Sequence, residues 1–397
     1  MMAISVLLAL VAAVLLAQTV SDLLSIGWAL GRGRPRAATP SRPQNLLVLI
    51  PAHDEELLIG DCVRSLMSLG YPPARLGVVV IADNCSDRTA TLARDAGARC
   101  LERHDKKLAG KPRAIAWALE QVRLSDYDAV AIIDADTVVD RHFVAELDAL
   151  GPLRAKAVQG FFDLSNPNET PITRMSAVLA TATHQFAYPL KGRAGLNVPL
   201  VGNGMVIGTD VLGRYGWHAF SICEDWEMFA LLTERGVAIE PAPRARILSQ
   251  EARSLRQSST QRQRWTAGKL TVLARVGPRM LRSRHIGLRQ KLDALAELAA
   301  PGPGLHLGLV VLLGVVCVTL HPRATTLLLG ALGASLLRQT AYAVAALMVQ
   351  PHPVQAVRAF AFLPIYALWR IGAALRSLRI LGDAPWVRTQ RHQTGGA

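Results

Sequence analysis

The chain has 397 residues, of which 51 % are hydrophobic and 19 % charged, and its mean hydropathy is +0.25. This composition excludes an intrinsically disordered chain and favours a protein that sits partly in a membrane. The formal net charge is +14, and thirteen lysines and arginines against one acid fall within residues 244–291, directly before an apolar C-terminal region. That position favours contact with an anionic membrane surface over nucleic-acid binding. Five cysteines without C-x-x-C spacing exclude a disulfide framework and suit a reducing compartment.

The first predicted element is a transmembrane helix within residues 1–30. Residues 4–17 are apolar apart from one serine, and the run extends to about Val20, which approaches the ~20 residues that a spanning helix needs. A cleaved signal peptide is the alternative, but no Lys or Arg precedes the run. By the positive-inside rule, the next domain lies in the cytosol, because it follows Arg32, Arg34 and Arg36.

Residues 44–275 have the pattern of a cytosolic α/β domain. Short β-rich runs alternate with helical stretches, which predicts a mostly parallel sheet covered by helices. The runs 46–50, 77–81 and 129–133 are continuously apolar, as strands buried on both faces should be. Polar side chains follow each run, and in such sheets ligands bind beyond the carboxyl ends of the strands. We therefore expect one crevice to contain His53, Asp54, Glu55, Asp83, Asn84, Asp134 and Asp136.

Two acids, Asp134 and Asp136, end the third run, and the two-residue period of a strand puts both carboxylates on one side of the chain. Mg²⁺ or Mn²⁺ is typically held by one or two carboxylates together with substrate phosphates. The pair therefore predicts a divalent metal bound with a nucleotide. A pair of acids that only cap a turn is the alternative.

Two further motifs place polar side chains at the starts of predicted helices. Lys111 precedes the helix 113–122, where it could reach a phosphate at the helix N-terminus; a solvated turn lysine is the alternative. Glu224 and Asp225 open the helix 226–235 and either cap it or present a general base at a fixed point.

A third motif shares one face of a predicted helix. Gln261, Arg264 and Trp265 stand at positions i, i+3 and i+4. A guanidinium matches a diphosphate through two hydrogen bonds, and an indole ring offers a flat platform for a sugar. An exposed amphipathic helix beside the membrane is the alternative.

The C-terminal part begins with a predicted interfacial helical segment, residues 276–302, followed by two transmembrane helices within residues 303–350. The apolar runs 305–320 and 324–349 are separated by a short turn that would lie on the outer side. Arg338 falls within the second run, where a charge facing lipid is costly. We expect it to face a protein interior or a polar acceptor path, with a broken or tilted helix as the alternative.

The last segment, residues 355–397, is predicted to form an interfacial helix and a basic cytosolic tail. Its apolar part, residues 359–375, contains Pro364 and Arg370. A further crossing would carry the arginines that follow to the outer side, so an interfacial helix is the preferred reading. Those arginines are Arg376, Arg379, Arg388 and Arg391.

Six ordered motifs between Leu46 and Trp265 read I-P-A-H-D-E-E, V-V-I-A-D-N-C-S-D, G-K-P-R-A, D-A-D, C-E-D-W and Q-R-Q-R-W. Together they resemble the membrane-bound, processive-type family 2 glycosyltransferases, which include cellulose, chitin, hyaluronan and poly-N-acetylglucosamine synthases. The ceramide glucosyltransferases are similar. The resemblance recurs at Pro364–Tyr366 and Trp386–Thr389. It implies a GT-A fold, a Rossmann-like nucleotide-diphospho-sugar transferase domain, which agrees with the α/β pattern, here with N- and C-terminal transmembrane helices.

The resemblance also implies which residues bind the donor. The first four in chain order would hold the nucleoside, and the last four would contact the diphosphate. They are Pro51, Ala52, Glu55, Asp83, Lys111, Asp134, Gln261 and Arg264.

Three other roles are implied by matching positions. Asp136, with Asp134, would ligate the metal. Asp225, with Glu224 beside it, would take the proton from the acceptor hydroxyl. Trp265 would line the acceptor site.

These observations predict a metal-dependent, inverting hexosyltransferase in the plasma (inner) membrane, with its catalytic domain in the cytosol. The donor would be a nucleoside-diphosphate sugar, with a UDP-sugar preferred, and the acceptor a hydroxyl of a membrane lipid or lipid-linked glycan. Because only three spanning helices are expected, a single transfer is preferred, and a processive polysaccharide synthase is the alternative. A non-catalytic nucleotide- or lipid-binding membrane subunit is the second alternative. Nucleic acid is not an expected partner, since the basic segment lacks interleaved aromatics.

Overall fold

The computed structural model describes residues 2–31 and 43–380. This part of the chain divides into two compact units, each assembled from separate stretches of sequence. The sheet unit consists of residues 43–166 and 198–251, and the helical unit of residues 2–31, 167–197 and 252–380. Some residues named above lie outside the described ranges: Arg32, Arg34, Arg36, Arg388, Arg391 and Trp386–Thr389.

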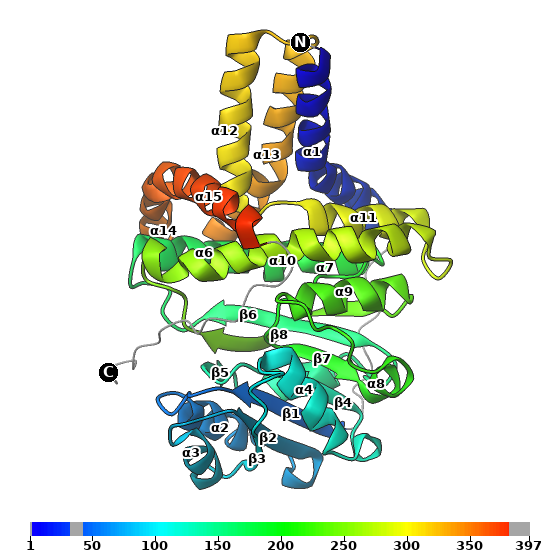
Figure 1. The fold of residues 1–397 in the computed structure, drawn as a ribbon, viewed down its shortest axis with the longest axis vertical. Coiled ribbons are helices and arrows are strands. Elements are labelled where there is room, and N and C mark those ends of the chain that lie inside the picture. The colour runs from blue at the N-terminus through cyan, green and yellow to red at the C-terminus, as the bar shows by residue number, and fades with distance from the viewer. Residues whose placement is uncertain (1, 32–42, 381–397) are drawn as a thin grey trace. The chain divides into compact units, whose positions relative to one another are not determined.

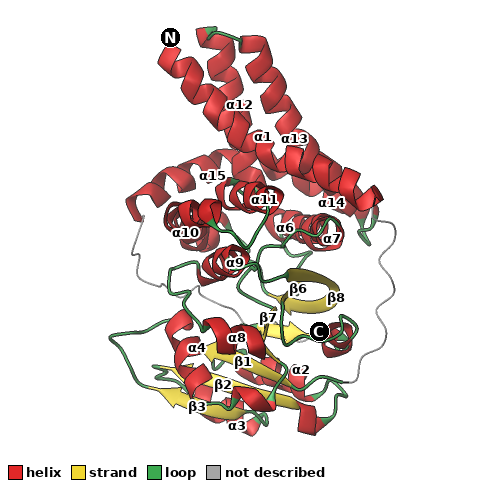
Figure 2. Cartoon of the chain, turned by 90° about the vertical axis from the view of Figure 1, so that its right-hand side faces the viewer, coloured by secondary structure: helices red, strands yellow, loops and turns green. Residues whose placement is uncertain are grey.

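The sheet unit is built on one sheet that has eight strands within the described residues, in the order β3-β2-β1-β4-β7-β6-β8-β5. Figure 2 draws strands of this sheet in yellow, with β3, β2 and β1 side by side. The strands β1 to β4 pair in parallel, and so do β6 and β8. The pairs β4–β7, β6–β7 and β5–β8 are antiparallel. The strands are β1 (Leu46–Ala52), β2 (Leu76–Asp83), β3 (Arg99–Arg103), β4 (Ala129–Ile132), β5 (Thr137–Val139), β6 (Ala157–Leu164), β7 (Met205–Gly208) and β8 (Ile239–Ser249).

The three predicted strands are confirmed, and the expected parallel arrangement holds for the half of the sheet that contains them. The other half is mixed, because β7 enters between β4 and β6 in the opposite direction. β1 shows why these strands are apolar throughout. Its residues Leu46, Val48 and Ile50 share a core cluster with α2 (Ile59–Met67), while the intervening Leu47 and Leu49 are also fully buried. α4 (Lys111–Glu120) also packs against β1 and β2, so the sheet is covered on both faces.

The helices predicted at 113–122 and 226–235 are confirmed, each beginning two residues earlier than expected. Lys111 is therefore the first residue of α4, and Glu224 the first residue of α9. The other α-helices of the sheet unit are α3 (Thr89–Asp95), α5 (Phe143–Asp148) and α8 (Thr209–Tyr215).

In the helical unit, α1, α12 and α13 run side by side, and α15 runs across them (Figure 1). The helices are α1 (Met2–Gly31), α6 (Pro171–Thr181), the π-helical η3 (Ala182–Ala187), α7 (Tyr188–Arg193), α10 (Leu255–Arg282), α11 (Leu288–Ala299), α12 (Pro303–Leu320), α13 (Thr325–Met348), α14 (Pro353–Ala359) and α15 (Leu363–Ser377).

Four stretches of the described chain are long and apolar enough to cross a membrane: α1, α12, α13 and residues 353–380. The first three are the predicted spans. The fourth is divided into α14, a short 3₁₀ turn and α15, and it does not run with the other three (Figure 1). The interfacial helix therefore stays a prediction, since the composition of this segment also permits a span.

Arg338 of α13 faces the interior of the helical unit, where its Nε donates to Asp22 Oδ2 of α1 over 2.7 Å. A second buried cation, Lys191 of α7, lies 2.5 Å from Asp293 Oδ1 and 2.7 Å from Glu297 Oε1 of α11. Glu297 and Arg338 are 3.9 Å apart, which joins the two pairs. This buried ion network ties α1, α7, α11 and α13 together and removes the need for Arg338 to face lipid.

Candidate active site

Lys111 forms the centre of the candidate site in the sheet unit. Its Nζ lies 2.6 Å from Asp134 Oδ1 and 3.4 Å from Glu224 Oε1, and it donates to the carbonyl of Gly202 over 2.5 Å. Burial acts to lower the pKa of Lys111, but the carboxylates of Asp134 and Glu224 outweigh burial and raise it above its ordinary value. The ammonium is therefore held charged beside the end of β4, at the first turn of α4.

Asp225 lies beside this ion pair cluster as the second residue of α9, with 9 % of its surface exposed. Its Oδ1 accepts the backbone N–H of Trp226 over 2.8 Å. Burial, followed by the neighbouring charge of Glu224, raises the pKa of Asp225 to about 7, against the opposing effect of Lys111. A carboxylate with this pKa can accept a proton near neutral pH.

Gly202 provides the room for Asp225. Its φ of +80° is in the left-handed region, which favours glycine, and a Cβ at this position would lie 3.1 Å from Asp225 Oδ2. The same residue supplies the carbonyl that binds Lys111. A single glycine turn therefore contacts both groups of the site.

Asp134 and Asp136 follow β4, as predicted. Besides its salt bridge to Lys111, Asp134 donates its backbone N–H to Asn203 Oδ1 over 3.1 Å. Asp136 lies near Cys62 of α2, where burial and then the Asp136 charge raise the pKa of the thiol. A neutral thiol is a poor ligand, so the available donors are carboxylate oxygens, which is the set that Mg²⁺ or Mn²⁺ prefers.

Two buried amides that were not predicted hold this strand end in place. Asn203 Nδ2 donates to Thr137 Oγ1 over 2.8 Å and to Ser249 Oγ over 2.9 Å. Gln159 Nε2 donates to the carbonyl of Asn203 over 2.9 Å, and its Oε1 accepts the N–H of Val201 over 2.9 Å. The only sequence signal is the G-N-G tripeptide before an apolar strand, which marks a tight turn without showing what it contacts.

Asp83 was predicted to bind the nucleoside, and its carboxylate is engaged within the protein. It pairs with Arg103 over 2.6 Å, and both side chains are 6 % exposed. Its Oδ2 accepts the N–H of Gly110 over 3.1 Å, and its Oδ1 accepts Asn84 Nδ2 over 2.9 Å. Because Gly110 directly precedes Lys111, Asp83 fixes the start of α4.

The remaining predicted nucleoside residues lie at the end of β1. Pro51 and Ala52 are its last two residues, and Glu55 donates its backbone N–H to Thr89 Oγ1 over 2.8 Å. His53 Nδ1 lies 2.7 Å from the carbonyl oxygen of Asp83. The ends of β1 and β2 are thus bonded together, as the crevice prediction requires.

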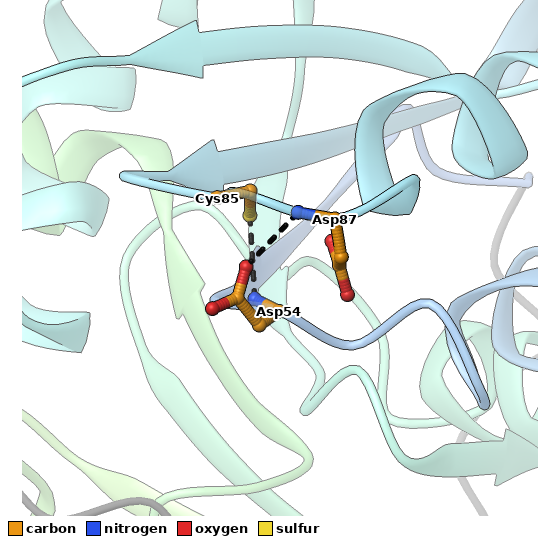
Figure 3. Close-up of side chains that lie close together, drawn as sticks. All are labelled: Asp54, Cys85 and Asp87. Atoms are coloured by element: carbon orange, nitrogen blue, oxygen red, sulfur yellow. Dashed lines mark hydrogen bonds between the residues drawn. The ribbon is translucent and has the colours of Figure 1, made fainter.

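Asp54, Cys85 and Asp87 form a cluster in the loops that follow β1 and β2 (Figure 3). Asp54 Oδ1 accepts the N–H groups of Ser86 and Asp87, over 2.7 and 3.3 Å, and the N–H of Asp54 donates to Cys85 Sγ over 3.4 Å. Burial raises the pKa of the Cys85 thiol to about 11, so the thiol is neutral. These hydrogen bonds connect the loop after β1 to the loop after β2, which explains why the three side chains lie close together.

Gln261, Arg264 and Trp265 belong to α10 of the helical unit, which confirms the predicted helix. Trp265 is 39 % exposed, and the guanidinium of Arg262 lies 4.6 Å from the centre of its ring. Their roles toward donor and acceptor stay a prediction.

The sequence of the sheet unit, together with residues 167–197 and the first turns of α10 from the helical unit, matches a known family. The model of the family described as "Glycosyltransferase like family 2" matches residues 43–268. The probable glycosyltransferase YdaM of Bacillus subtilis is 26 % identical over 231 residues, which are 56 % of this chain and 54 % of that protein. The beta-monoglucosyldiacylglycerol synthase of Trichormus variabilis is 27 % identical over 188 residues, 46 % of this chain and 39 % of that protein. The chain thus spans about half or less of each relative.

One solved structure is similar over nearly the whole chain. The mannosyltransferase PcManGT from Pyrobaculum calidifontis, in complex with GDP-Man and Mn²⁺, superposes with a TM-score of 0.60 at 18 % identity, covering 95 % of this chain and 98 % of that one. This likeness confirms the GT-A fold. The family match contains every strand of the sheet and each residue of the Lys111–Asp225 site, and the chain accordingly belongs to the glycosyltransferase-like family 2.

Proposed function

We propose that the protein transfers a sugar from a nucleoside-diphosphate sugar, preferentially a UDP-sugar, to a hydroxyl of a membrane lipid or lipid-linked acceptor, with inversion at the anomeric carbon. The observation that carries this proposal is that a buried carboxylate, Asp225, and a fixed ammonium, Lys111, both lie against the glycine turn at Gly202. The first can accept a proton at neutral pH, and the second can stabilise a departing anion. Family membership and the GT-A fold support the same activity.

Sugar transfer needs two things from the protein. The incoming hydroxyl must lose its proton, for which Asp225 has a suitable pKa. The departing diphosphate must be stabilised, for which Lys111 offers a charged, pre-positioned donor. Because Lys111 holds both Asp134 and Glu224, Asp225 is the one carboxylate of this cluster expected to act as the base. A single displacement is therefore expected, and it inverts the configuration.

A divalent metal fits the donor set of this site. Asp136 and Asp134 are the residues that would hold it, and a bound Mg²⁺ or Mn²⁺ would supply further positive charge to the diphosphate. PcManGT is described with GDP-Man and Mn²⁺, which supports a metal and a nucleotide sugar here. It also makes GDP-sugars necessary members of any donor screen.

The acceptor is assigned from the helical unit. Its apolar helices are long enough to cross a membrane, which supports a location at a bilayer, and a relative is named for the synthesis of a glucosyl-diacylglycerol. A lipid hydroxyl at the cytosolic face of the plasma (inner) membrane is therefore the proposed acceptor, with one sugar added per molecule.

The test uses the full-length protein purified in detergent and mixed with membrane lipids and radiolabelled UDP-, GDP- or dTDP-sugars. A single-sugar glycolipid is expected after extraction, and a ladder of sizes would contradict single transfer. Asp225→Asn should lower transfer by roughly 10²–10⁴-fold while nucleotide binding, measured by calorimetry, stays near the wild-type level. The matched control is Asp210→Asn, which alters an exposed carboxylate on α8 and should leave both unchanged. Near-normal transfer by Asp225→Asn would reject the assignment of the base.

A further inference from the structure

α15 carries a buried arginine whose charge is not neutralised within the described residues. Arg370 is 6 % exposed, and its Nη1 is buried without a hydrogen-bond partner. Among residues 2–31 and 43–380, no carboxylate forms a salt bridge with it, although the other buried cations of the helical unit, Lys191 and Arg338, each have one. Burying an unpaired charge is strongly unfavourable, so this guanidinium is suited to an anion supplied from outside the described residues.

A second guanidinium reinforces this positive potential. α10 packs against α15, and Arg262 of α10 is close enough to Arg370 to repel it electrostatically. Tyr366, one turn before Arg370 on α15, also interacts electrostatically with the Arg370 guanidinium. A phosphate group accepts paired hydrogen bonds from guanidinium forks, so an anion bound at Arg370 would also feel the positive charge of Arg262.

An apolar cavity of about 250 Å³ lies next to Arg370 in the same unit. Its walls come from α6, α12, α13 and α15, and most of the side chains are aliphatic or aromatic. Side chains on its walls include Ile172, Met175, Leu307, Leu336, Leu347 and Leu363.

Gly304, at the start of α12, is the point where the cavity and the arginine meet. It lines the cavity together with Tyr366, and a Cβ on it would lie 2.4 Å from the Tyr366 ring and 3.4 Å from Arg370 Cγ. The glycine thus lets both side chains approach the helix backbone. A ligand that used the cavity and the guanidinium at once would need an apolar tail directly joined to an anionic group.

We propose that Arg370, with Arg262 beside it, binds the phosphate of a membrane lipid whose alkyl chain enters the cavity bordered by Gly304 and Tyr366. A lipid, and not a soluble phosphate, is the occupant because α12 and α13, which form part of the wall, are candidate membrane spans, so the cavity adjoins the region of lipid chains. The proposal concerns binding alone and does not require that this lipid accept a sugar.

The test measures binding of dioleoyl phosphatidic acid to the detergent-purified, full-length protein by native mass spectrometry, without any sugar donor. Phosphatidic acid should bind at least tenfold more tightly than dioleoylglycerol, which has the same chains and no phosphate. Arg370→Met should weaken phosphatidic acid binding by roughly ten- to a hundredfold, the range for a lost hydrogen bond to a charged group. Arg376→Met, an exposed arginine on the same helix, is the matched control and should bind as the wild type does.

Three results would overturn the proposal: equal binding of phosphatidic acid to the wild type and Arg370→Met, equal affinity for the two lipids, or displacement of phosphatidic acid by an equal concentration of inorganic phosphate. Because Arg370→Met removes an unpaired buried charge, its unfolding temperature without lipid should equal or exceed that of the wild type. Should that variant fail to fold, Ala343→Phe fills the cavity while keeping the arginine. It must weaken phosphatidic acid binding, and unchanged affinity would equally overturn the proposal.

Discussion

The chemistry of the site depends on the ionisation of one residue, Asp225. Its pKa in the folded protein is about 7, raised from 3.8 chiefly by burial and then by Glu224. A base must be ionised to accept a proton, so its active fraction is about half at the pKa, nearly full one pH unit above it, and falls about tenfold for each further pH unit well below it. We expect the transfer rate at low donor concentration to drop by about tenfold between pH 8 and pH 6.

The control for this pH profile is donor binding over the same range, which should change much less. A flat profile of transfer between pH 6 and pH 8 would contradict the role of Asp225 as the base. A profile that falls toward high pH would indicate instead that a protonated group is needed.

Asn203 holds the chain at the end of β4 through its side-chain hydrogen bonds, so its removal should destabilise the protein. Asn203→Ala leaves the N–H of Asp134 without its acceptor, while Thr137 and Ser249 keep the 2.7 Å bond between their hydroxyls. One partly buried N–H loses its acceptor, which costs about 1–3 kcal/mol. Thermal unfolding should show a fall of a few degrees, and transfer should fall because the Asp134 loop is no longer fixed. Wild-type values for both would show that the bonds of Asn203 are dispensable.

These two residues mark what could and could not be predicted from the sequence. The positions of Asp225, Lys111 and Asp134 could be predicted, because ligand-binding side chains gather at strand ends and helix starts in a sheet of this kind. Asn203 could not, because its side-chain partners Thr137 and Ser249 lie 66 and 46 residues away. Their proximity depends on how β5 pairs with β8, which no local pattern records.

At the level of helices, the Asp22–Arg338 ion pair joins α1 and α13 in addition to their shared apolar cluster. Replacing Arg338 by Leu leaves Asp22 buried without its cation, and such a loss typically costs about 3–5 kcal/mol. The double variant Asp22→Leu/Arg338→Leu removes both charges and should recover most of this loss. Unfolding temperatures of the detergent-purified variants measure the effect.

The second single variant, Asp22→Leu, completes the cycle and should also be destabilised. If the double variant were as unstable as the sum of the two single ones, the residues would not be coupled and the pairing of α1 with α13 through them would be wrong.

The direction of α15 shows a limit of hydropathy as a guide. Residues 353–380 meet the length and composition of a span, yet the stretch is divided by a 3₁₀ turn and α15 runs across α1, α12 and α13 (Figure 1). Arginines near its end favoured an interfacial helix in the sequence. Hydropathy alone does not distinguish a spanning helix from an interfacial one, because it measures the solvent that a helix prefers and not the direction in which the helix runs.

For the whole molecule, the proposed orientation puts the sheet unit in the cytosol and the turn between α12 and α13 on the outer side. In a variant without native cysteines, Arg323→Cys in that turn should react with a membrane-impermeant maleimide in intact cells. Asp210→Cys, on the exposed surface of α8, should react only after the membrane is permeabilised. The opposite pattern of labelling would show the reverse orientation. Recovery of the protein in the soluble fraction of the cells would contradict a membrane location.

The α/β class and the apolar helices at both ends could be predicted because each follows from a local period or a long apolar run. The grouping of residues 167–197 with the apolar helices could not be predicted from the sequence. That stretch contains a buried lysine, Lys191, whose carboxylate partners Asp293 and Glu297 come about a hundred residues later. Sequence patterns describe each segment by itself, whereas this grouping depends on charges that meet only in the folded chain.

Because three separate stretches of the chain form the helical unit, truncation at the two ends cannot isolate the sheet unit. A fragment ending after α10 would retain Lys191 and lose Asp293 and Glu297, which leaves an ammonium group in the interior with neither of its counter-ions. A water-soluble version for crystallisation therefore calls for excision of residues 167–197 and a designed loop in their place, in addition to removal of the terminal helices.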